Sequence, residues 1–294
     1  MIGTVGLVTD SNSQLPPALA ERYGVEVVPL TVTVDGREHQ EGVDLDADAF
    51  YAHFADGAAP TVTTTQPGPG TVEVAYRRLV EQGATEILSI HIASAMSGTL
   101  NSARLAAAAV DVPVRLVDSG TASFGIACCV WEAAEALVAG RSVDEAARRA
   151  EALVAHIGNV FVVRALDLAR RGGRLIAATP IDDGAGDVGD AIPVLSLIGG
   201  ELQVVGTAAH LDAAAEVMAA YVVEAGAALG GAGASGGLRV AMGIADAEAE
   251  PVRLALEARL LELDVVTELV HYRIGPSVGV HTGPGAAGAF FFPA

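Results

Sequence analysis

The sequence contains no lysine. Its 17 basic residues are all arginines, whereas aspartate and glutamate together number 36, and the formal net charge is −19. The absence of lysine excludes Schiff-base catalysis and the lysine of a Walker-type phosphate loop. The excess of negative charge argues against a nucleic-acid partner, because proteins bind phosphates mainly by neutralising them with lysine and arginine.

Cysteine, aromatic residues and long apolar runs are also scarce. The two cysteines, Cys128 and Cys129, are neighbours in an apolar stretch that we expect to be helical. Adjacent helical side chains point in different directions, so we interpret both as small buried hydrophobic residues. Glycine and proline interrupt the longest uncharged run, which follows Arg273, and the N-terminus lacks the pattern of a secretory signal. We therefore predict a cytoplasmic globular protein without integral membrane segments.

Short apolar runs alternate with helical patterns along the first half of the chain, which is typical of a parallel sheet with helices on its faces. A second series of strands and helices begins near Asn159 and ends with a closing segment from Val278 to Phe292. We therefore predict an α/β protein with two lobes, residues 1–158 and 159–294, and a ligand site at their interface. The first lobe should hold a mostly parallel sheet, with strands at residues 5–9, 25–34, 86–91 and 114–117.

Several glycine-rich matches to nucleotide or hydrolase motifs lack the context that their chemistry needs. Three G-x-G-x-x-G matches begin at Gly184, Gly231 and Gly283. A dinucleotide site needs this motif between a strand and a helix, because the helix N-terminus supplies the hydrogen-bond donors for the pyrophosphate. None of the three has that context, and a G-x-S-x-G match around Ser235 follows a predicted helix instead of a strand. We predict no cofactor and no metal site.

Ser97, Gly98 and Thr99 lie where an apolar strand ends and a helix is predicted to begin. Unpaired backbone N–H groups, the positive end of the helix dipole and a hydroxyl group converge at such a point, which favours an anion. An ordinary serine N-cap has the same pattern. The segment alone leaves both interpretations open.

Two further segments carry groups that would suit the same anion. Thr63, Thr64 and Thr65 lie in a predicted loop, residues 61–70, and loops at the carboxyl ends of neighbouring parallel strands share one edge of a sheet. His281 follows a predicted strand in the second lobe, and a protonated imidazole donates hydrogen bonds to anions. Taken singly, the threonines also fit a plain polar loop and the histidine a structural position.

Six segments, in order along nearly the whole chain, resemble the motifs of the DegV family of bacterial fatty-acid-binding proteins. They are VTDSNSQLP (residues 8–16), TTTQPGPG (63–70), SAMSGTLNSA (94–103), VDSGTASFG (117–125), LARRGGRL (168–175) and IGPSVGVHTGPGAAGAFFF (274–292). The resemblance implies a two-lobed α/β protein that holds a long-chain fatty acid in an interior tunnel, with the carboxylate at the lobe interface. It also implies a lipid-binding protein without catalysis of its own. Its partner would be a separate ATP-dependent kinase subunit that converts the presented fatty acid to acyl phosphate.

The same resemblance assigns expected roles to particular residues. Thr64, Ser97 with Gly98, and His281 match motif positions that are expected to bind the carboxylate. Arg174, in the Gly-Gly-Arg segment, is a candidate for steadying the interface or the transferred phosphate, and a surface arginine is the other interpretation.

Two stretches depart from the family's usual pattern. Ile192 stands where the family usually has a lysine, and Asp187 and Asp190 precede it in a stretch that the family keeps apolar. Residues 206–210 lack the arginine that usually follows the preceding hairpin. The first difference concerns the predicted fit of the acyl chain and the second the docking of a kinase subunit, whereas the predicted carboxylate site is unchanged.

The alternative function is a self-sufficient serine hydrolase of acyl esters. It would use Ser97 as nucleophile and His281 as base, with Asp118 behind the imidazole. This mechanism requires Ser97 and His281 within hydrogen-bond reach of each other. The sequence around Ser97 lacks a nucleophile elbow, which disfavours the alternative.

Overall fold

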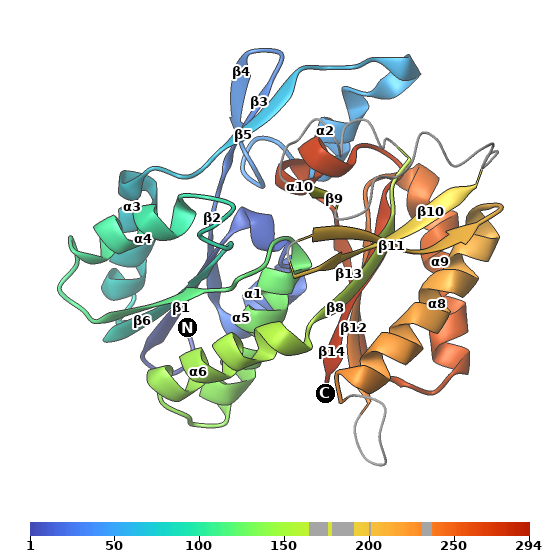
Figure 1. The fold of residues 1–294 in the computed structure, drawn as a ribbon. Coiled ribbons are helices and arrows are strands. Elements are labelled where there is room, and N and C mark those ends of the chain that lie inside the picture. Colours follow the sequence, from blue (N-terminus) through green and yellow to red (C-terminus); the bar gives the residue numbers. More distant parts are fainter. Residues whose placement is uncertain (165–175, 178–190, 200, 231–236) are drawn as a thin grey trace. The chain divides into compact units, whose positions relative to one another are not determined.

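The chain divides into two compact units in the computed structural model, which describes residues 1–164, 176–177, 191–199, 201–230 and 237–294 (Figure 1). Unit 1 comprises Met1–Asp46, Ala59–Ala155 and Gly275–Ser277. Unit 2 comprises Ala47–Ala58, His156–Ile274 and Val278–Ala294. The chain therefore passes between the units more than once, and the division into lobes of residues 1–158 and 159–294 stays a prediction.

Unit 1 contains a four-stranded sheet in which every strand runs parallel to its neighbours, as predicted. Its order is β2-β1-β6-β7, and its strands are β1 (Val5–Asp10), β2 (Val25–Val28), β6 (Glu86–His91) and β7 (Val114–Asp118). The central strands β1 and β6 are almost entirely buried, because helices cover both faces of a parallel sheet. The apolar runs that predicted these strands are the consequence of this double burial.

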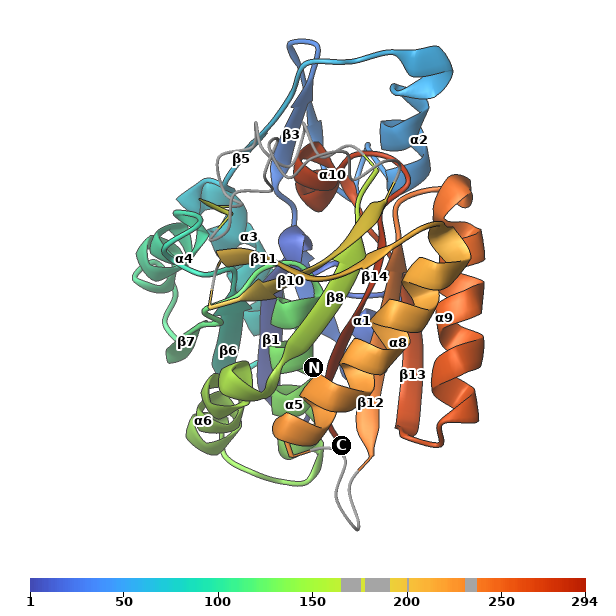
Figure 2. The ribbon, with the colours of Figure 1, turned by 45° about the vertical axis from the view of Figure 1, so that its right-hand side comes forward.

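Five helices of unit 1 lie against this sheet, and four of them pack in two pairs. They are α1 (Pro17–Tyr23), α3 (Pro69–Glu81), α4 (Thr99–Ala107), α5 (Phe124–Val138) and α6 (Val143–Leu153), with short 3-10 helices η1 (Ser11–Ser13) and η3 (Val154–His156) beside them. Figures 1 and 2 show α3 and α4 on one face of the sheet and α5 and α6 on the other. Val8 and Ile87 pack with α3 and α4 in one core cluster. Cys128 and Cys129 are buried in α5, as predicted.

A second, three-stranded antiparallel sheet in unit 1 corrects two of the expectations. Its order is β4-β3-β5, and its strands are β3 (Thr31–Val34), β4 (Arg37–Gln40) and β5 (Val62–Thr65). The stretch 25–34, predicted as one strand, is divided between two sheets at Pro29, which cannot donate a ladder hydrogen bond. The predicted loop at residues 61–70 is wrong for 62–65, because β-branched threonines are strong strand formers that here pair with β3.

Unit 2 is built on a seven-stranded mixed sheet of order β13-β12-β14-β8-β10-β11-β9. Its strands are β8 (Gly158–Val162), β9 (Ile176–Ala177), β10 (Ile192–Ile198), β11 (Glu201–Ala208), β12 (Leu238–Ile244), β13 (Val266–Arg273) and β14 (Ala287–Pro293). Helices α8 (Leu211–Ala228) and α9 (Glu250–Glu262) lie side by side against the sheet in both ribbon views. Their core cluster includes Met218, Leu256 and Phe291. Phe291 and Phe292 are buried, and Phe290 is half-buried.

The remaining helical segments of unit 2 are α2 (Ala47–Ala52), η2 (Ala55–Gly57), η4 (Ala247–Ala249) and most of α10 (Pro276–Thr282). The closing segment from Val278 to Phe292 therefore begins in a helix. Pro276 suits the first turn of a helix, and Gly283, with a φ of 71°, ends it in the left-handed conformation that glycine adopts without strain. The second part of the closing segment lies in β14.

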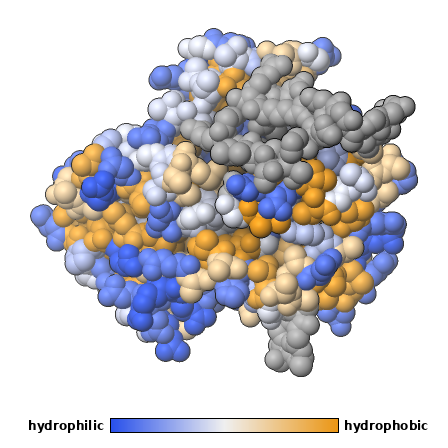
Figure 3. All heavy atoms as spheres, in the orientation of Figure 1, coloured by the Kyte–Doolittle hydropathy of each residue, from blue (hydrophilic) through white to orange (hydrophobic). Residues whose placement is uncertain are grey.

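The described helices include none with the length and apolar character needed to cross a bilayer. On the face shown in Figure 3, hydrophilic residues gather over α6. This helix exposes Asp144 and Arg148, and its first turn is capped by the Ser142 hydroxyl, which accepts a hydrogen bond from Glu145 N at 3.2 Å.

Candidate functional site

Ser97 and Gly98 immediately precede α4, which begins at Thr99. The Ser97 hydroxyl oxygen accepts a hydrogen bond from Thr99 N at 3.3 Å and lies 2.9 Å from Thr99 Oγ1. The serine therefore binds the first N–H of the helix, but the N-cap residue is Gly98, so the ordinary serine N-cap is not the arrangement found. Ser97 and Thr99 each carry one hydroxyl proton. Only one of these two protons lies between the two oxygen atoms, so the other is directed away from the pair. No acidic residue occupies the first turn of α4, so this arrangement also remains suited to an anion.

Gly98 is in contact with a side chain that was absent from the predicted site, Gln66. A Cβ atom at position 98 would overlap the Gln66 amide group, whereas the φ of −77° at Gly98 is open to any residue. Gln66 is exposed, so its amide group could move aside, and the close packing favours glycine without requiring it. Gln66 follows β5, which contains the half-buried Thr64 in register with Val32. The structure thus brings the segment after Thr64 against the start of α4, although Thr64 lies on a strand instead of in a loop.

Asp118, at the end of β7, binds the loop that follows β6. Its carboxylate accepts hydrogen bonds from Ser94 N at 3.2 Å, from the Ser94 hydroxyl, and from Gly120 N at 3.0 Å. The loops after two neighbouring strands are joined in this way. An aspartate engaged by these donors does not favour the hydrolase alternative, in which Asp118 was expected to support an imidazole.

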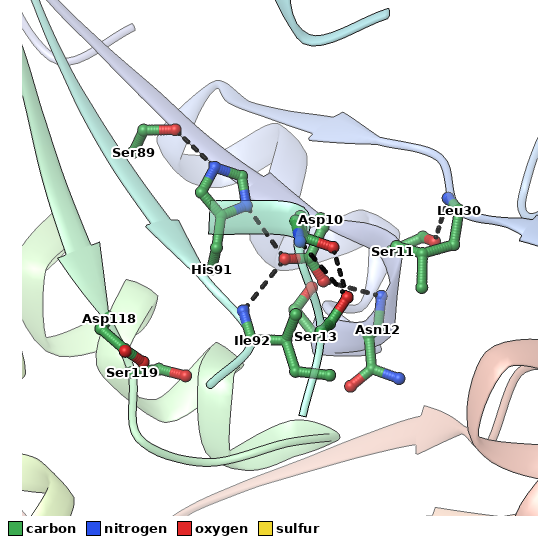
Figure 4. Close-up of polar contacts among 12 residues, drawn as sticks. Asp10, Ser11, Asn12, Ser13, Leu30, Ser89, His91, Ile92, Asp118 and Ser119 are labelled. Atoms are coloured by element: carbon green, nitrogen blue, oxygen red, sulfur yellow. Dashed lines mark hydrogen bonds and ion pairs between the residues drawn. The ribbon is translucent and has the colours of Figure 1, made fainter. Parts of the chain in front are cut away.

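A buried chain of side chains links β1, β6 and α3, and no local sequence pattern indicates it. The Tyr76 hydroxyl donates to Ser89 Oγ at 2.9 Å, Ser89 Oγ lies 2.7 Å from His91 Nε2, and His91 Nδ1 lies 2.9 Å from Asp10 Oδ2. Figure 4 shows Ser89, His91 and Asp10 pointing toward one another from the two strands. Ser89 Oγ thus joins the tyrosine to the imidazole, and the imidazole joins the serine to the Asp10 carboxylate. Burial raises the pKa of Tyr76 to about 12, so the tyrosine remains a donor.

The order of serine, histidine and aspartate in this chain is that of a hydrolase triad, but its surroundings indicate a structural role. The side chains of Asp10, Ser89 and His91 are all fully buried, so no substrate can approach the serine. Asp10 also accepts hydrogen bonds from Ile92 N and Asn12 N, both at 3.1 Å. The aspartate therefore fixes the backbone just after two adjacent strands, at the carboxyl edge of the sheet.

Glu41 is a second buried acid in unit 1, at the end of the strand pair β3 and β4. Its Oε2 accepts from the Ser11 hydroxyl and its Oε1 from Ser277 N at 2.8 Å. Burial raises the pKa of the Glu41 carboxyl above 4.5, and hydrogen bonds from Ser11, Ser277 and Gln14 lower it in part. The Glu41 carboxyl group therefore binds its proton more tightly in the folded protein than in the unfolded chain.

This linkage predicts how stability depends on pH. With its folded-state pKa raised, Glu41 contributes stability that is complete below pH 4.5 and is lost as the pH rises through the folded-state pKa. The unfolding free energy of the natural protein, relative to that of Glu41→Gln, should fall across this window and then become constant. Urea unfolding at a series of pH values checks this, and a difference independent of pH would contradict it.

His281 lies on α10, where the sequence had suggested a position after a strand. It is half-buried, and its helix packs closely on α2 within unit 2. A Cβ atom at Gly279 would lie 2.6 Å from the Tyr51 hydroxyl and 2.7 Å from Phe50 Cε1, so only glycine permits this approach. The packing on α2 and the end of the helix at Gly283 fix the short helix on which the imidazole stands.

The glycines after His281 have structural roles of their own. Gly283 N donates to Gly279 O at 2.8 Å, and Gly285, with a φ of 72°, donates from its N–H to Asp246 Oδ2 at 2.9 Å. Gly288 lies inside β14. This G-x-G-x-x-G match therefore leads from a helix into a strand, the reverse of a dinucleotide site.

Some of the predicted residues lie outside the described residues. They are Arg174, Asp187, Asp190, Ser235 and the glycine matches that begin at Gly184 and Gly231. Within the ranges that are described, no three histidine, cysteine, aspartate or glutamate side chains come together as a metal ion would require.

Comparison with known proteins decides the family. A family model described as "Uncharacterised protein, DegV family" matches residues 4–294. The chain belongs to the DegV family. It is 36% identical over 288 residues to a DegV domain-containing protein of Streptomyces coelicolor, a match that covers 97% of this chain and 96% of that protein. The resemblance drawn from six sequence motifs is therefore confirmed.

Solved structures of DegV proteins share the fold. A DegV family protein from Thermus thermophilus, described by its fatty acid binding, is 31% identical, with a TM-score of 0.85 over 99% of this chain and 100% of that one. A stearic acid-binding protein from Eubacterium ventriosum, 24% identical over 98% of both chains, has a TM-score of 0.80. The α/β fold with a helix-flanked parallel sheet is thus common to this DegV member and its structural neighbours.

Proposed function

We propose that this DegV protein binds a long-chain fatty acid in an interior tunnel, with the carboxylate at the interface of its two lobes. The observation that carries the proposal is the similarity, along the whole of both chains, to the fatty-acid-binding protein from Thermus thermophilus at 31% identity. Similarity of this extent includes the segments that contain Ser97, Thr64 and His281.

The proposed carboxylate ligands are Thr64, Ser97, Gly98 and His281. At the start of α4, the pair of hydroxyl groups at Ser97 and Thr99 has one proton directed away from the pair, and a carboxylate oxygen is a suitable acceptor for it. The positive end of the α4 dipole favours the same negative charge. His281 would add a donor from a second segment, and Arg174 would steady the interface or a phosphate.

The acyl chain would supply most of the binding free energy. A saturated chain offers no polar group, so each methylene removed from water contributes about 0.8 kcal/mol. The carboxylate contacts would then determine which end of the fatty acid lies at the lobe interface, since a buried polar group must keep its hydrogen bonds.

We further propose that the protein presents this carboxylate to a separate ATP-dependent kinase subunit. The carboxylate oxygen would attack the γ-phosphorus of ATP, which gives acyl phosphate and ADP. Transfer to ATP-bound phosphorus needs positive charge around the phosphates. This sequence has no lysine and a net charge of −19, which supports placing the phosphate chemistry on the partner.

Removal of the Ser97 hydroxyl should deplete the bound fatty acid. Purified natural protein should release about one equivalent of long-chain fatty acid into an organic extract, and Ser97→Ala about a tenth of it, because a hydrogen bond to a charged group contributes roughly 1.5–3 kcal/mol. His281→Ala should cause a similar loss. Mass spectrometry of the extract, with the protein quantified in parallel, measures both.

The control is Ser142→Ala, which removes another serine hydroxyl beside a helix start, the exposed N-cap of α6. It should retain the fatty acid of the natural protein. An extract of well-folded natural protein without fatty acid would refute the proposal. Turnover of an acyl ester that Ser97→Ala abolishes would instead support the hydrolase alternative.

A further inference from the structure

A three-residue segment of the chain, Gly275–Ser277, is grouped with unit 1, although Ile274 and Val278 on either side belong to unit 2. Three polar side chains of unit 1 hold it, and we call them the clasp residues: Asn12, Gln14 and Glu41. They are only 6%, 8% and 6% exposed. Buried polar side chains need hydrogen-bond partners, and in the clasp the segment supplies several of them.

The clasp residues bind both backbone and side chain of the segment. Gln14 Oε1 accepts a hydrogen bond from Gly275 N, and Glu41 Oε1 accepts one from Ser277 N at 2.8 Å. The Ser277 hydroxyl accepts from Asn12 Nδ2 and from Gln14 Nε2, both at 3.2 Å. A Cβ atom at Gly275 would lie 2.7 Å from Gln14 Oε1 and 2.8 Å from Glu41 Oε1. The segment is therefore held so closely that only glycine fits at its start.

The clasp residues are themselves fixed from behind. Asn12 Oδ1 accepts from Ser123 N at 3.0 Å, and Asn12 N donates to Asp10 of the buried chain shown in Figure 4. Glu41 is hydrogen-bonded to the Ser11 hydroxyl. The side chains that hold the segment are thus joined to the parallel sheet and the start of α5, which makes the clasp a rigid support.

The backbone conformation of Gln14 also indicates that the clasp is a rigid support. Gln14 has a φ of 55°, in the left-handed region that residues with a side chain rarely adopt. Such a conformation persists where the surrounding contacts favour it strongly. Here the Gln14 amide group makes contacts with Gly275, Ser277, Glu41 and the carbonyl oxygen of Ser11.

The held segment contains the first turn of the helix that carries His281. Helix α10 runs from Pro276 to Thr282, so Ser277 and His281 are four residues apart and lie on the same helix face. Fixing the N–H and hydroxyl groups of Ser277 therefore fixes the rotation of α10 about its axis. That rotation determines the direction of the imidazole one turn further along.

We propose that Asn12, Gln14 and Glu41 are positioning residues that act through α10 to orient the His281 imidazole for the fatty acid carboxylate. This inference rests on the proposed function. Its physical basis is preorganisation: a donor already held in the bound orientation loses less conformational freedom when the ligand arrives. Without the clasp, the His281 imidazole could still donate a hydrogen bond, but α10 would no longer hold it in a fixed direction.

A double-mutant cycle on the delipidated full chain tests the inference, with stearate as the probe and the dissociation constant from calorimetry as the readout. Glu41→Ala and His281→Ala should each weaken stearate binding about tenfold, the loss expected for one charge-assisted hydrogen bond. The double variant should bind no more weakly than His281→Ala alone, because Glu41 acts through the histidine. Glu41→Gln keeps an oxygen that accepts from Ser277 N and should restore most of the affinity.

Controls separate this result from a general loss of fold or charge. Glu73→Ala removes an exposed carboxylate of α3 that pairs with Arg77, and it should bind stearate as the natural protein does. If Glu41→Ala does not fold, Ser277→Ala takes its place in the cycle, since it removes only the hydroxyl shared by two clasp residues.

Two results would overturn the inference while leaving the proposed function intact. One is natural affinity in Glu41→Ala, and the other is a double variant weakened about a hundredfold, the product of two independent losses. A natural protein that takes up no stearate and releases no fatty acid would instead overturn the proposed function, and the inference with it.

Discussion

Asp10→Ala should lower the unfolding free energy of unit 1 by roughly 3–5 kcal/mol, the loss typical of removing one partner from a buried polar pair. The substitution leaves His91 Nδ1, Ile92 N and Asn12 N without their acceptor. Asp10 and His91 are fully buried, so water cannot replace the lost carboxylate without opening the sheet edge.

The matched control for this prediction is Asp118→Ala. Asp118 also ends a parallel strand and accepts hydrogen bonds from the following loops, but it is exposed, so water can take over its donors. We expect a loss of about 0.5–1.5 kcal/mol there. Trp131, the chain's one tryptophan, lies buried in α5 of unit 1, so its fluorescence during urea unfolding reports on this unit. Equal losses in the two variants would show that the buried chain is not a special source of stability.

The contrast between these two aspartates also explains what the sequence could and could not predict. The strands β1 and β6 were predictable, because burial on both faces leaves a continuous apolar run in the sequence. The pairing of Asp10 with His91 was not, because the two residues are 81 positions apart and nothing local indicates that they meet. A polar residue at either position could equally indicate only that a strand ends there, so it does not predict the pairing.

Local composition misled the prediction at two places. The threonines of β5 were interpreted as a polar loop, although β-branched side chains favour strands when a partner strand such as β3 is available. Around His281, the many glycines obscured the short helix α10, which is maintained by contacts with α2 and with the clasp residues. Those contacts join residues up to 265 positions apart, so they became visible only in three dimensions.

The candidate site shows the same division. The helix start after Ser97 and Gly98 was predictable, because a strand, a hydroxyl group and a helix start are neighbours in sequence, whereas the role of these residues in binding stays a prediction. The partner of Gly98, the Gln66 side chain, was missed, since a glycine gives no sign of what packs against it. Glu41 was missed because a lone glutamate usually lies on the surface, and its burial depends on Ser11 and Ser277 from two distant segments.

Gly288→Ala should destabilise unit 2 by roughly 2–3 kcal/mol, although it adds a single methyl group. Gly288 lies in β14 and pairs with Phe161 of β8. A Cβ atom there would lie 2.6 Å from Phe161 Cβ and 2.7 Å from the Val160 carbonyl oxygen. Backbone atoms and a Cβ cannot rotate away, so β14 and β8 would have to separate in the middle of the sheet.

Gly70→Ala makes the same chemical change with the opposite expected sign. Gly70 lies in the first turn of α3, and no atom lies within 4 Å of the position that its Cβ would take. Alanine there should stabilise unit 1 by roughly 0.4–1 kcal/mol, because it restricts the unfolded chain without a clash in the folded one. Hydrogen exchange of peptides from β8 and β14 measures the effect of Gly288→Ala, and protection equal to that of the natural protein would show that these strands accommodate a methyl group.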